Sequence, residues 1–186
     1  MLVLASASPR RRELLTQAGF SFEVQAADID ESVHPGEDPI AYVTRLAREK
    51  AQAVFALRAG SDQSLTVLGA DTTVCVDKQI LGKPESPEDA ARMLRLLSGR
   101  THRVITGVAL VSATQTQVAA EVTAVQFLTL SEAEIAGYIA TGEPNDKAGA
   151  YAIQGHAARW IPRIEGCYFN VVGLPIALVS TLLRSL

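Results

Sequence analysis

Two long segments of β-strand character, 101–112 and 117–130, constrain this chain most, because only a short polar turn separates them. Such a pattern is typical of an antiparallel pair, so we expect the two segments to form the centre of a sheet. Segments of strand and helix character alternate ahead of them, with irregular connections and no internal repeat. The sequence therefore predicts an α/β protein with a mixed sheet flanked by helices, rather than a regular doubly wound sheet.

Capping residues predict where the helices begin and end. Ser8 and Pro9 suit the N-cap and first position of a helix that Gly19 ends, and Asp38 starts a second helix that ends near Gly60. Ser131, with a glutamate three residues later, forms a capping box. Further helices are predicted over 86–99 and 175–183, and further strands over 1–5, 22–26, 65–70 and 73–76.

Composition excludes several functional classes. The 186 residues fit one domain, 1–186, with an ordinary hydrophobic content of 48%. A net charge of -3 disfavours a nucleic-acid partner, which would require a basic face. Cys75 and Cys167 lack the spacing of a zinc site and suit a reducing compartment. With no signal-like start and no membrane-spanning run, we expect a cytoplasmic protein with no membrane contact.

A run of arginines follows the N-cap residue Ser8, at positions Arg10, Arg11 and Arg12. A helix N-terminus offers unpaired backbone N–H groups and a positive dipole, and guanidinium groups are planar donors for phosphate oxygens. The alternative is a solvated basic helix face. Cations in a first turn oppose the helix dipole, however, and such violations of local preference are expected at functional sites. We therefore favour an anion-binding site here.

Acidic residues follow two of the predicted strands. Asp28, Asp30 and Glu31 lie in a predicted loop, and Asp71 with Thr72 follows the apolar run 65–70. Such carboxylates could hold a hard cation such as Mg²⁺ or act as a base on water. For the loop, solvated capping residues are an equally good interpretation. For Asp71 a partner or a role is required, because an idle carboxylate at the tip of a buried strand would be costly to desolvate.

Two lysines and a glutamine complete the candidate site. Lys83 lies between a glycine and a proline, but Asp77 and Pro84 stand where a P-loop would need glycine and serine or threonine. Lys83, and Lys50 from the end of the long helix, could still place positive charge on phosphate. Gln154 carries a donor and an acceptor that match the imide face of uracil or thymine. A surface lysine and an internally bonded glutamine are the alternatives.

With these residues in view, the sequence resembles the Maf family of nucleotide pyrophosphatases. The resemblance rests on segments in the family's order and approximate spacing: LASASPRRRELL, DESVHPGEDPIAYVTRLAREKA, GADT, ILGKP, TGVAL, NDKAGAYAIQG and NVVGLP. It implies an elongated α/β fold related to the inosine triphosphate pyrophosphatases, with two lobes around a central cleft, and a homodimer. The IQG segment with Tyr168 and Asn170 is similar to the dTTP/UTP subgroup rather than the 7-methyl-GTP subgroup. Cys167 replaces a usual serine.

The resemblance also implies roles for individual residues. Asp71 corresponds to the catalytic base. Positions tied to base selection are Arg10, Thr72 and Gln154, and positions lining the triphosphate and a divalent metal (Mg²⁺, Mn²⁺ or Co²⁺) are Glu31, Lys50 and Lys83.

These roles lead to a hypothesis for the reaction. Arg11, Lys50 and Lys83 would clamp the triphosphate, Glu31 and Asp71 would hold the cation, and Asp71 would activate water to hydrolyse dTTP or UTP. The same cations would also suit a non-catalytic nucleotide-binding regulator of cell division. Such a regulator would not need a carboxylate placed to act on water, so we favour the enzyme.

Overall fold

The computed structural model describes residues 1–58, 60 and 64–186, which form two compact units. Unit 1 comprises Met1–Thr72, Thr106–Glu121 and Gly173–Leu186. Unit 2 comprises Thr73–Ile105 and Val122–Val172.

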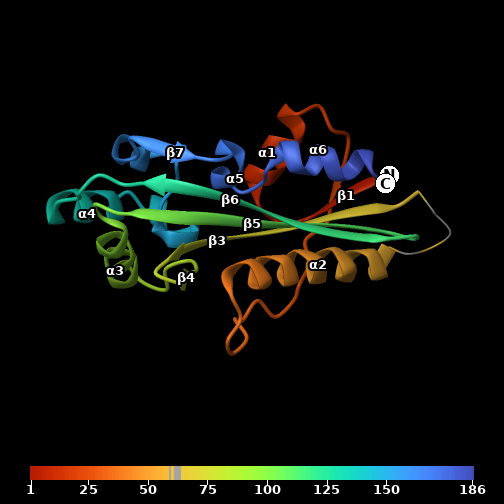
Figure 1. The fold of residues 1–186 in the computed structure, drawn as a ribbon, viewed down its shortest axis with the longest axis horizontal. Helices are drawn as coiled ribbons and strands as arrows, with labels where there is room; N and C mark the ends of the chain where they lie inside the picture. The colour runs from red at the N-terminus through yellow and green to blue at the C-terminus, as the bar shows by residue number, and fades with distance from the viewer. Residues whose placement is uncertain (59, 61–63) are drawn as a thin grey trace. The chain divides into compact units, whose positions relative to one another are not determined.

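Helices and strands alternate through the described residues (Figure 1). The strands are β1 (Leu2–Ala5), β2 (Glu23–Val24), β3 (Thr66–Val76), β4 (Gln79–Leu81), β5 (Thr101–Ser112), β6 (Thr116–Gln126) and β7 (Arg163–Glu165). The α-helices are α1 (Pro9–Gln17), α2 (Pro39–Arg58), α3 (Pro87–Leu97), α4 (Glu132–Ile139), α5 (Tyr168–Val172) and α6 (Ile176–Arg184). Short 3₁₀ helices lie at Glu143–Asp146, Ala148–Ala150 and His156–Trp160. Within these ranges, none of the helices has the length and apolar character required to cross a membrane.

The strands form a mixed sheet, as predicted. Their order is β2-β1-β3-β5-β6-β7, with β4 paired to β3 outside this path. The β1 strand is parallel to both β2 and β3, whereas β4 and β7 are antiparallel to their partners. A three-residue turn at 113–115 joins β5 to β6, which confirms the predicted hairpin. In unit 1, parallel pairing of β1 with the first half of β3 places two buried strands side by side.

Unit 1 is built around the long helix α2. It lies along one face of the strands of this unit, and α1 and α6 lie on the other face (Figure 1). Two strand glycines let the α2 backbone approach closely. A Cβ at Gly69 would lie 2.0 Å from the carbonyl oxygen of Ala47, and one at Gly107 would lie 2.3 Å from that of Val43. Apolar residues of β1, β3 and β5 pack with α2 in one cluster.

Unit 2 has a core rich in aromatic side chains. The helices α3 and α4 contact each other, and both contact the 3₁₀ segments. Five ring-bearing side chains pack edge to face: His102, Phe127 and Tyr151 with one another, and Tyr138 with Trp160. Asp77 and Lys78 turn the chain between β3 and β4 with positive φ angles of 49° and 66°.

The structure corrects the predicted strands at three places. The segments 65–70 and 73–76 are one continuous strand, β3, so Asp71 lies inside the strand and not at its tip. The predicted strand 117–130 ends at Gln126, and 22–26 reduces to two residues. Sequence reasoning missed β4, β7, α5 and the 3₁₀ helices, which are too short for a periodic pattern. The long helix is observed as far as Arg58, close to its predicted end near Gly60, and residue 59 lies outside the described residues.

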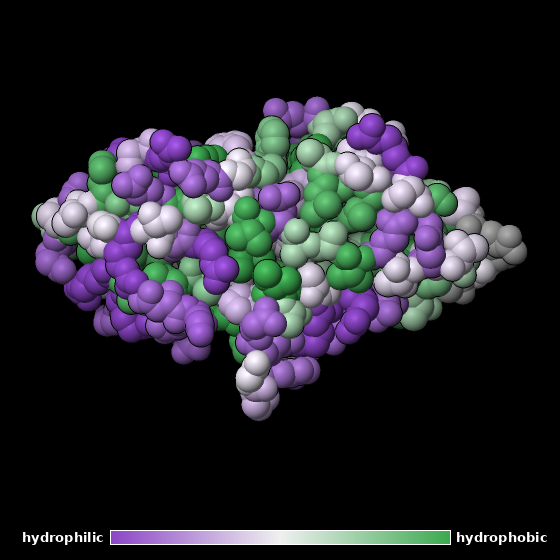
Figure 2. All heavy atoms as spheres, in the orientation of Figure 1, coloured by the Kyte–Doolittle hydropathy of each residue, from purple (hydrophilic) through white to green (hydrophobic). Residues whose placement is uncertain are grey.

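The loop ahead of α2 stands out on the molecular surface. Residues 31–36 are all exposed, and their stretch of chain projects below α2 as a pale and purple protrusion (Figures 1 and 2). Val33 is the only large hydrophobic residue in this stretch, and it is 48% exposed. Hydrophobic burial therefore contributes little to the position of this loop.

Candidate active site

An ion pair between α2 and β3 forms the centre of the candidate site in unit 1. Asp71 is only 8% exposed and Lys50 only 7%, and the Nζ atom of Lys50 donates a hydrogen bond to Oδ1 of Asp71 at 2.7 Å. The same Nζ lies 2.8 Å from Oε1 of Glu31, whose side chain is 53% exposed. One buried ammonium group therefore joins a buried carboxylate to a carboxylate that solvent can reach.

Lys50 occupies a core-facing position of α2. It is buried together with residues at helical spacing along one face, namely Val43, Leu46, Ala47, Ala51 and Val54. It lies well inside the helix, which corrects our placement of Lys50 at the helix end. The close approach of α2 to Gly69, two residues before Asp71, brings the ammonium group within reach of the strand.

A charged pair at this position requires an explanation. Removing two charges from water is unfavourable, and well-packed apolar side chains of similar volume are often as stable or more stable. Lys50 interrupts an apolar helix face, and Asp71 interrupts an apolar strand. Violations of the hydrophobic pattern in two neighbouring elements indicate a site that is retained for chemistry rather than for stability.

Arg11 lies beside this pair and binds several protein groups. Its Nε donates to the carbonyl oxygen of Gly173 at 2.9 Å, its Nη1 to Oγ of Ser6 at 3.2 Å, and its Nη2 to Oγ1 of Thr72 at 3.0 Å. Burial lowers the pKa of the Arg11 guanidinium, and the negative charge of Asp71 opposes this shift. Since arginine stays protonated in proteins, Arg11 places a fixed positive charge next to the strand that carries Asp71.

The helix that carries Arg11 begins as predicted. Ser8 is the N-cap of α1, and its side chain accepts a hydrogen bond from the backbone N–H of Arg11 at 3.5 Å. Thr72 shares a hydrogen bond with Oγ1 of Thr106 at 2.9 Å. The structure thus brings together most of the site residues predicted in unit 1: Ser8, Arg11, Glu31, Lys50, Asp71 and Thr72. Arg10, the remaining one, lies in the first turn of α1.

The other two predicted residues belong to unit 2. Lys83 is an exposed residue of the loop between β4 and α3, and Gln154 is exposed in a turn at 152–155. Hydrogen bonds hold both ends of that turn. The hydroxyl of Tyr138 accepts from the N–H of Ala152 at 3.2 Å, and the carboxylate of Glu143 accepts from the N–H of His156 at 3.1 Å. The roles of Lys83 and Gln154 stay predictions.

Comparison with known proteins decides the family. A family model described as Maf-like protein matches residues 1–186. The chain belongs to the Maf family. Curated relatives named dTTP/UTP pyrophosphatase include one from Hahella chejuensis, 53% identical over 98% of this chain and 90% of that protein. Another, from Moorella thermoacetica, is 55% identical over 98% of this chain and 93% of its own length. The resemblance inferred from the motifs is confirmed.

A comparison of structures supports the fold class. The structure of the Staphylococcus aureus Ham1 protein matches 99% of this Maf chain and 98% of its own, with a TM-score of 0.54. The two sequences are only 12% identical, so the likeness concerns the fold alone. It confirms the predicted α/β class.

The carboxylates of this Maf chain fit a hard divalent cation. Glu31 and Asp71 already share one cation, the ammonium group of Lys50, at 2.8 and 2.7 Å. Among the described residues, no group of three or more His, Cys, Asp or Glu side chains is arranged to hold a metal ion. Mg²⁺ is usually bound by one or two carboxylates plus substrate phosphates rather than by a complete protein cage. The pair of carboxylates suits that partial role.

Sequence reasoning missed two residues on α2. The hydroxyl of Tyr42 donates to the backbone carbonyl of Glu31 at 2.9 Å. Arg45 Nη2 donates to the backbone carbonyl of Ser32 at 2.9 Å. The two donors lie three residues apart and therefore on one helix face. Spacing was the available signal, but their partners are loop carbonyls, which no sequence pattern identifies.

Proposed function

We propose that this chain hydrolyses dTTP and UTP to the nucleoside monophosphate and pyrophosphate. The buried pair of Lys50 and Asp71, with Glu31 on the same ammonium group, is the observation that carries the proposal. The names of relatives that are 53–55% identical over almost the whole chain support the substrate class. They favour this activity over that of the 7-methyl-GTP subgroup.

Asp71 serves as the catalytic base. Its carboxylate orients a water molecule and accepts one of its protons as the water oxygen bonds to the α-phosphorus. The bond from the α-phosphorus to the bridging oxygen of the β-phosphate breaks, and pyrophosphate leaves. Lys50 and Arg11 provide positive charge for the phosphate oxygens, with Ser8 at the N-terminus of α1.

A divalent cation, held by Glu31 and Asp71, would neutralise phosphate charge and make the phosphorus more electrophilic. Mg²⁺, Mn²⁺ and Co²⁺ are the candidate cations for these two carboxylates. We assign Lys83 to the triphosphate, and Arg10, Thr72 and Gln154 to base selection, on the family resemblance. The amide of Gln154 offers a donor and an acceptor to the pyrimidine imide.

We also propose a cytoplasmic homodimer whose chain is a single domain with two lobes around a cleft. The free cysteines Cys75 and Cys167 suit a reducing compartment. The net charge of -3 is unfavourable for a nucleic-acid partner. Size-exclusion chromatography with light scattering would test the dimer.

Replacement of the base tests the proposed activity. Asp71→Asn should reduce pyrophosphate release from dTTP by about 10²- to 10⁴-fold, because the amide cannot accept the proton. Release is measured with added inorganic pyrophosphatase and phosphate detection. Asp77→Asn is the matched control, because Asp77 is an exposed turn residue and asparagine tolerates its positive φ.

Two results would overturn the proposal. One is unchanged turnover in Asp71→Asn with a native circular dichroism spectrum. The other is a wild-type chain that binds dTTP yet releases no pyrophosphate with Mg²⁺, Mn²⁺ or Co²⁺, which would favour a nucleotide-binding regulator.

A further inference from the structure

The loop that carries Glu31 is held by polar contacts to a single face of α2. Residues 31–36 are exposed and contribute almost no hydrophobic burial, yet the Glu31 carboxylate lies on Lys50. An unrestrained exposed loop samples many conformations, and ordering it is entropically unfavourable. Something other than packing must therefore fix the backbone from which Glu31 extends.

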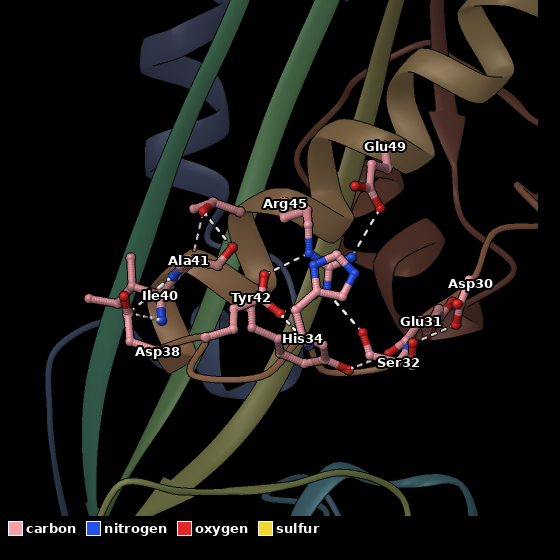
Figure 3. Close-up of polar contacts among 12 residues, drawn as sticks. Asp30, Glu31, Ser32, His34, Asp38, Ile40, Ala41, Tyr42, Arg45 and Glu49 are labelled. Carbon is pink, nitrogen blue, oxygen red and sulfur yellow. Dashed lines mark hydrogen bonds and ion pairs between the residues drawn. The ribbon is translucent and has the colours of Figure 1, made fainter.

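Arg45 supplies most of these contacts, and Figure 3 shows its guanidinium between the loop and the helix. Its Nε and Nη2 donate to the two carboxylate oxygens of Glu37 at 2.6 and 2.8 Å, a bidentate pair in which both side chains are nearly buried. Its Nη2 also donates to the Ser32 carbonyl. Glu37 in turn accepts from the N–H of His34 at 3.0 Å. One side chain thus binds both ends of the loop.

Tyr42 fixes the residue next to Ser32. Its hydroxyl donates to the backbone carbonyl of Glu31 at 2.9 Å, and its ring lies 5.7 Å from the Arg45 guanidinium (Figure 3). Burial raises the pKa of Tyr42 to about 12, and the negative charges of Asp71 and Glu31 add to the shift. The hydroxyl consequently keeps its proton and remains a donor at neutral pH.

We propose that Arg45 and Tyr42 are positioning residues that hold the Glu31 carboxylate beside Lys50 and thereby set the affinity of the site for its divalent cation. The inference rests on the proposed function, in which Glu31 is a metal ligand. Two adjacent carbonyls, of Glu31 and Ser32, are fixed by two donors one helical turn apart. The backbone from which Glu31 extends is therefore fixed before the cation binds.

The expected effect concerns metal binding rather than the chemical step. Partners that orient metal ligands typically change metal affinity by about 10- to 100-fold when removed. Arg45→Lys keeps the positive charge but removes the fork that binds Glu37 and Ser32 together. Tyr42→Phe keeps the ring and removes only the hydroxyl. We expect the Mn²⁺ concentration for half-maximal activity to rise about 10-fold in Arg45→Lys and less in Tyr42→Phe, with kcat at saturating Mn²⁺ nearly unchanged.

Glu49→Gln is the matched control. Glu49 contacts the same guanidinium at 3.1 Å, but it lies on α2 itself, so this contact does not reach the loop. The variant loses one ion pair of Arg45 and should keep the wild-type Mn²⁺ dependence.

Direct binding provides a second readout. Mn²⁺ binding to protein saturated with α,β-imido-dUTP, followed by the loss of the free-ion electron paramagnetic resonance signal, should weaken about 10-fold in Arg45→Lys. Hydrogen exchange at the His34 amide should quicken in the same variant. Unchanged Mn²⁺ affinity in both variants, or an equal fall of kcat at every Mn²⁺ concentration, would overturn the inference while the wild type remains active. An inactive wild type would instead overturn the proposed function. The Mn²⁺ affinities of the wild type and Arg45→Lys would still test the inference in that case.

Discussion

The two units bury polar side chains in opposite ways. In unit 1, Lys50 and Asp71 form a buried pair of opposite charges. In unit 2, His102 is 2% exposed and its Nε2 lies 2.7 Å from the hydroxyl of Tyr151. Burial lowers the pKa of His102 to about 4 and raises that of Tyr151, so both are neutral at pH 7. The pair in unit 2 avoids buried charge, whereas the pair in unit 1 keeps it, as expected where charge is needed for chemistry.

Removal of one charge from the buried Lys50–Asp71 pair should destabilise unit 1 strongly. Lys50→Met keeps the side-chain volume but leaves Asp71 without its buried partner, which should lower the free energy of unfolding by about 3–5 kcal/mol. Urea denaturation at pH 7 measures the loss. Adding Asp71→Leu to Lys50→Met should recover most of it, because the apolar pair needs no counter-charge. A loss below about 1 kcal/mol in Lys50→Met would show that buried Asp71 does not need the positive charge of Lys50.

Acid should affect unit 2 next. Burial lowers the pKa of His102 to about 4 in the folded protein, from its ordinary value of 6.5. The unfolded chain therefore binds a proton at this residue first, so the free energy of unfolding falls as pH decreases from about 6.5 to 4, by up to about 3 kcal/mol. The stability contribution is fully present above pH 6.5.

Urea denaturation across this pH range provides the measurement, with His102→Gln as the comparison. Glutamine can still bond to the Tyr151 hydroxyl but does not titrate, so the variant should show a flatter pH dependence. If the free energy of unfolding changes equally with pH in both proteins, a residue other than His102 takes up the proton. Among the residues that the structure describes, Nδ1 of His102 has no hydrogen-bond partner, consistent with a ring that burial alone keeps neutral.

Local signals in the sequence predicted much of the fold. The capping residues Ser8, Ser86 and Ser131 mark the helix starts that the structure has, because the interactions that end a helix lie within a few residues. The break predicted at Asp71 was wrong for a physical reason. An acid in an apolar run indicates a strand end unless a distant cation compensates it, and Lys50 is 21 residues away.

The candidate site was only partly accessible to the same reasoning. Asp71, Glu31 and Lys50 were predicted from residue type and from the family resemblance, and Lys50 also interrupts the buried stripe of α2. Arg45 and Tyr42 could not, since they bind backbone carbonyls, which carry no sequence identity. No local sequence pattern distinguishes an arginine that orders a loop from one that is solvated.

The smallest expected effect compares the acid response of the Glu31 loop with that of unit 2. The hydrogen bonds and charge of Arg45 lower the pKa of Glu37 to about 2 from 4.5, and the N–H of His34 contributes to this shift. The contribution of this pair to stability is thus present above about pH 4.5 and is lost as the pH falls toward 2.

Hydrogen exchange, corrected for its intrinsic pH dependence, measures the response of the loop. The amides of residues 31–37 should stay protected at pH 5, where protonation of His102 has already begun to destabilise unit 2. Glu37→Gln should remove the hydrogen-exchange protection of the loop at pH 7 without changing the acid response of unit 2. Loss of loop protection between pH 6.5 and 5 in the wild type would mean that the loop responds to unit 2 rather than to its own ion pair.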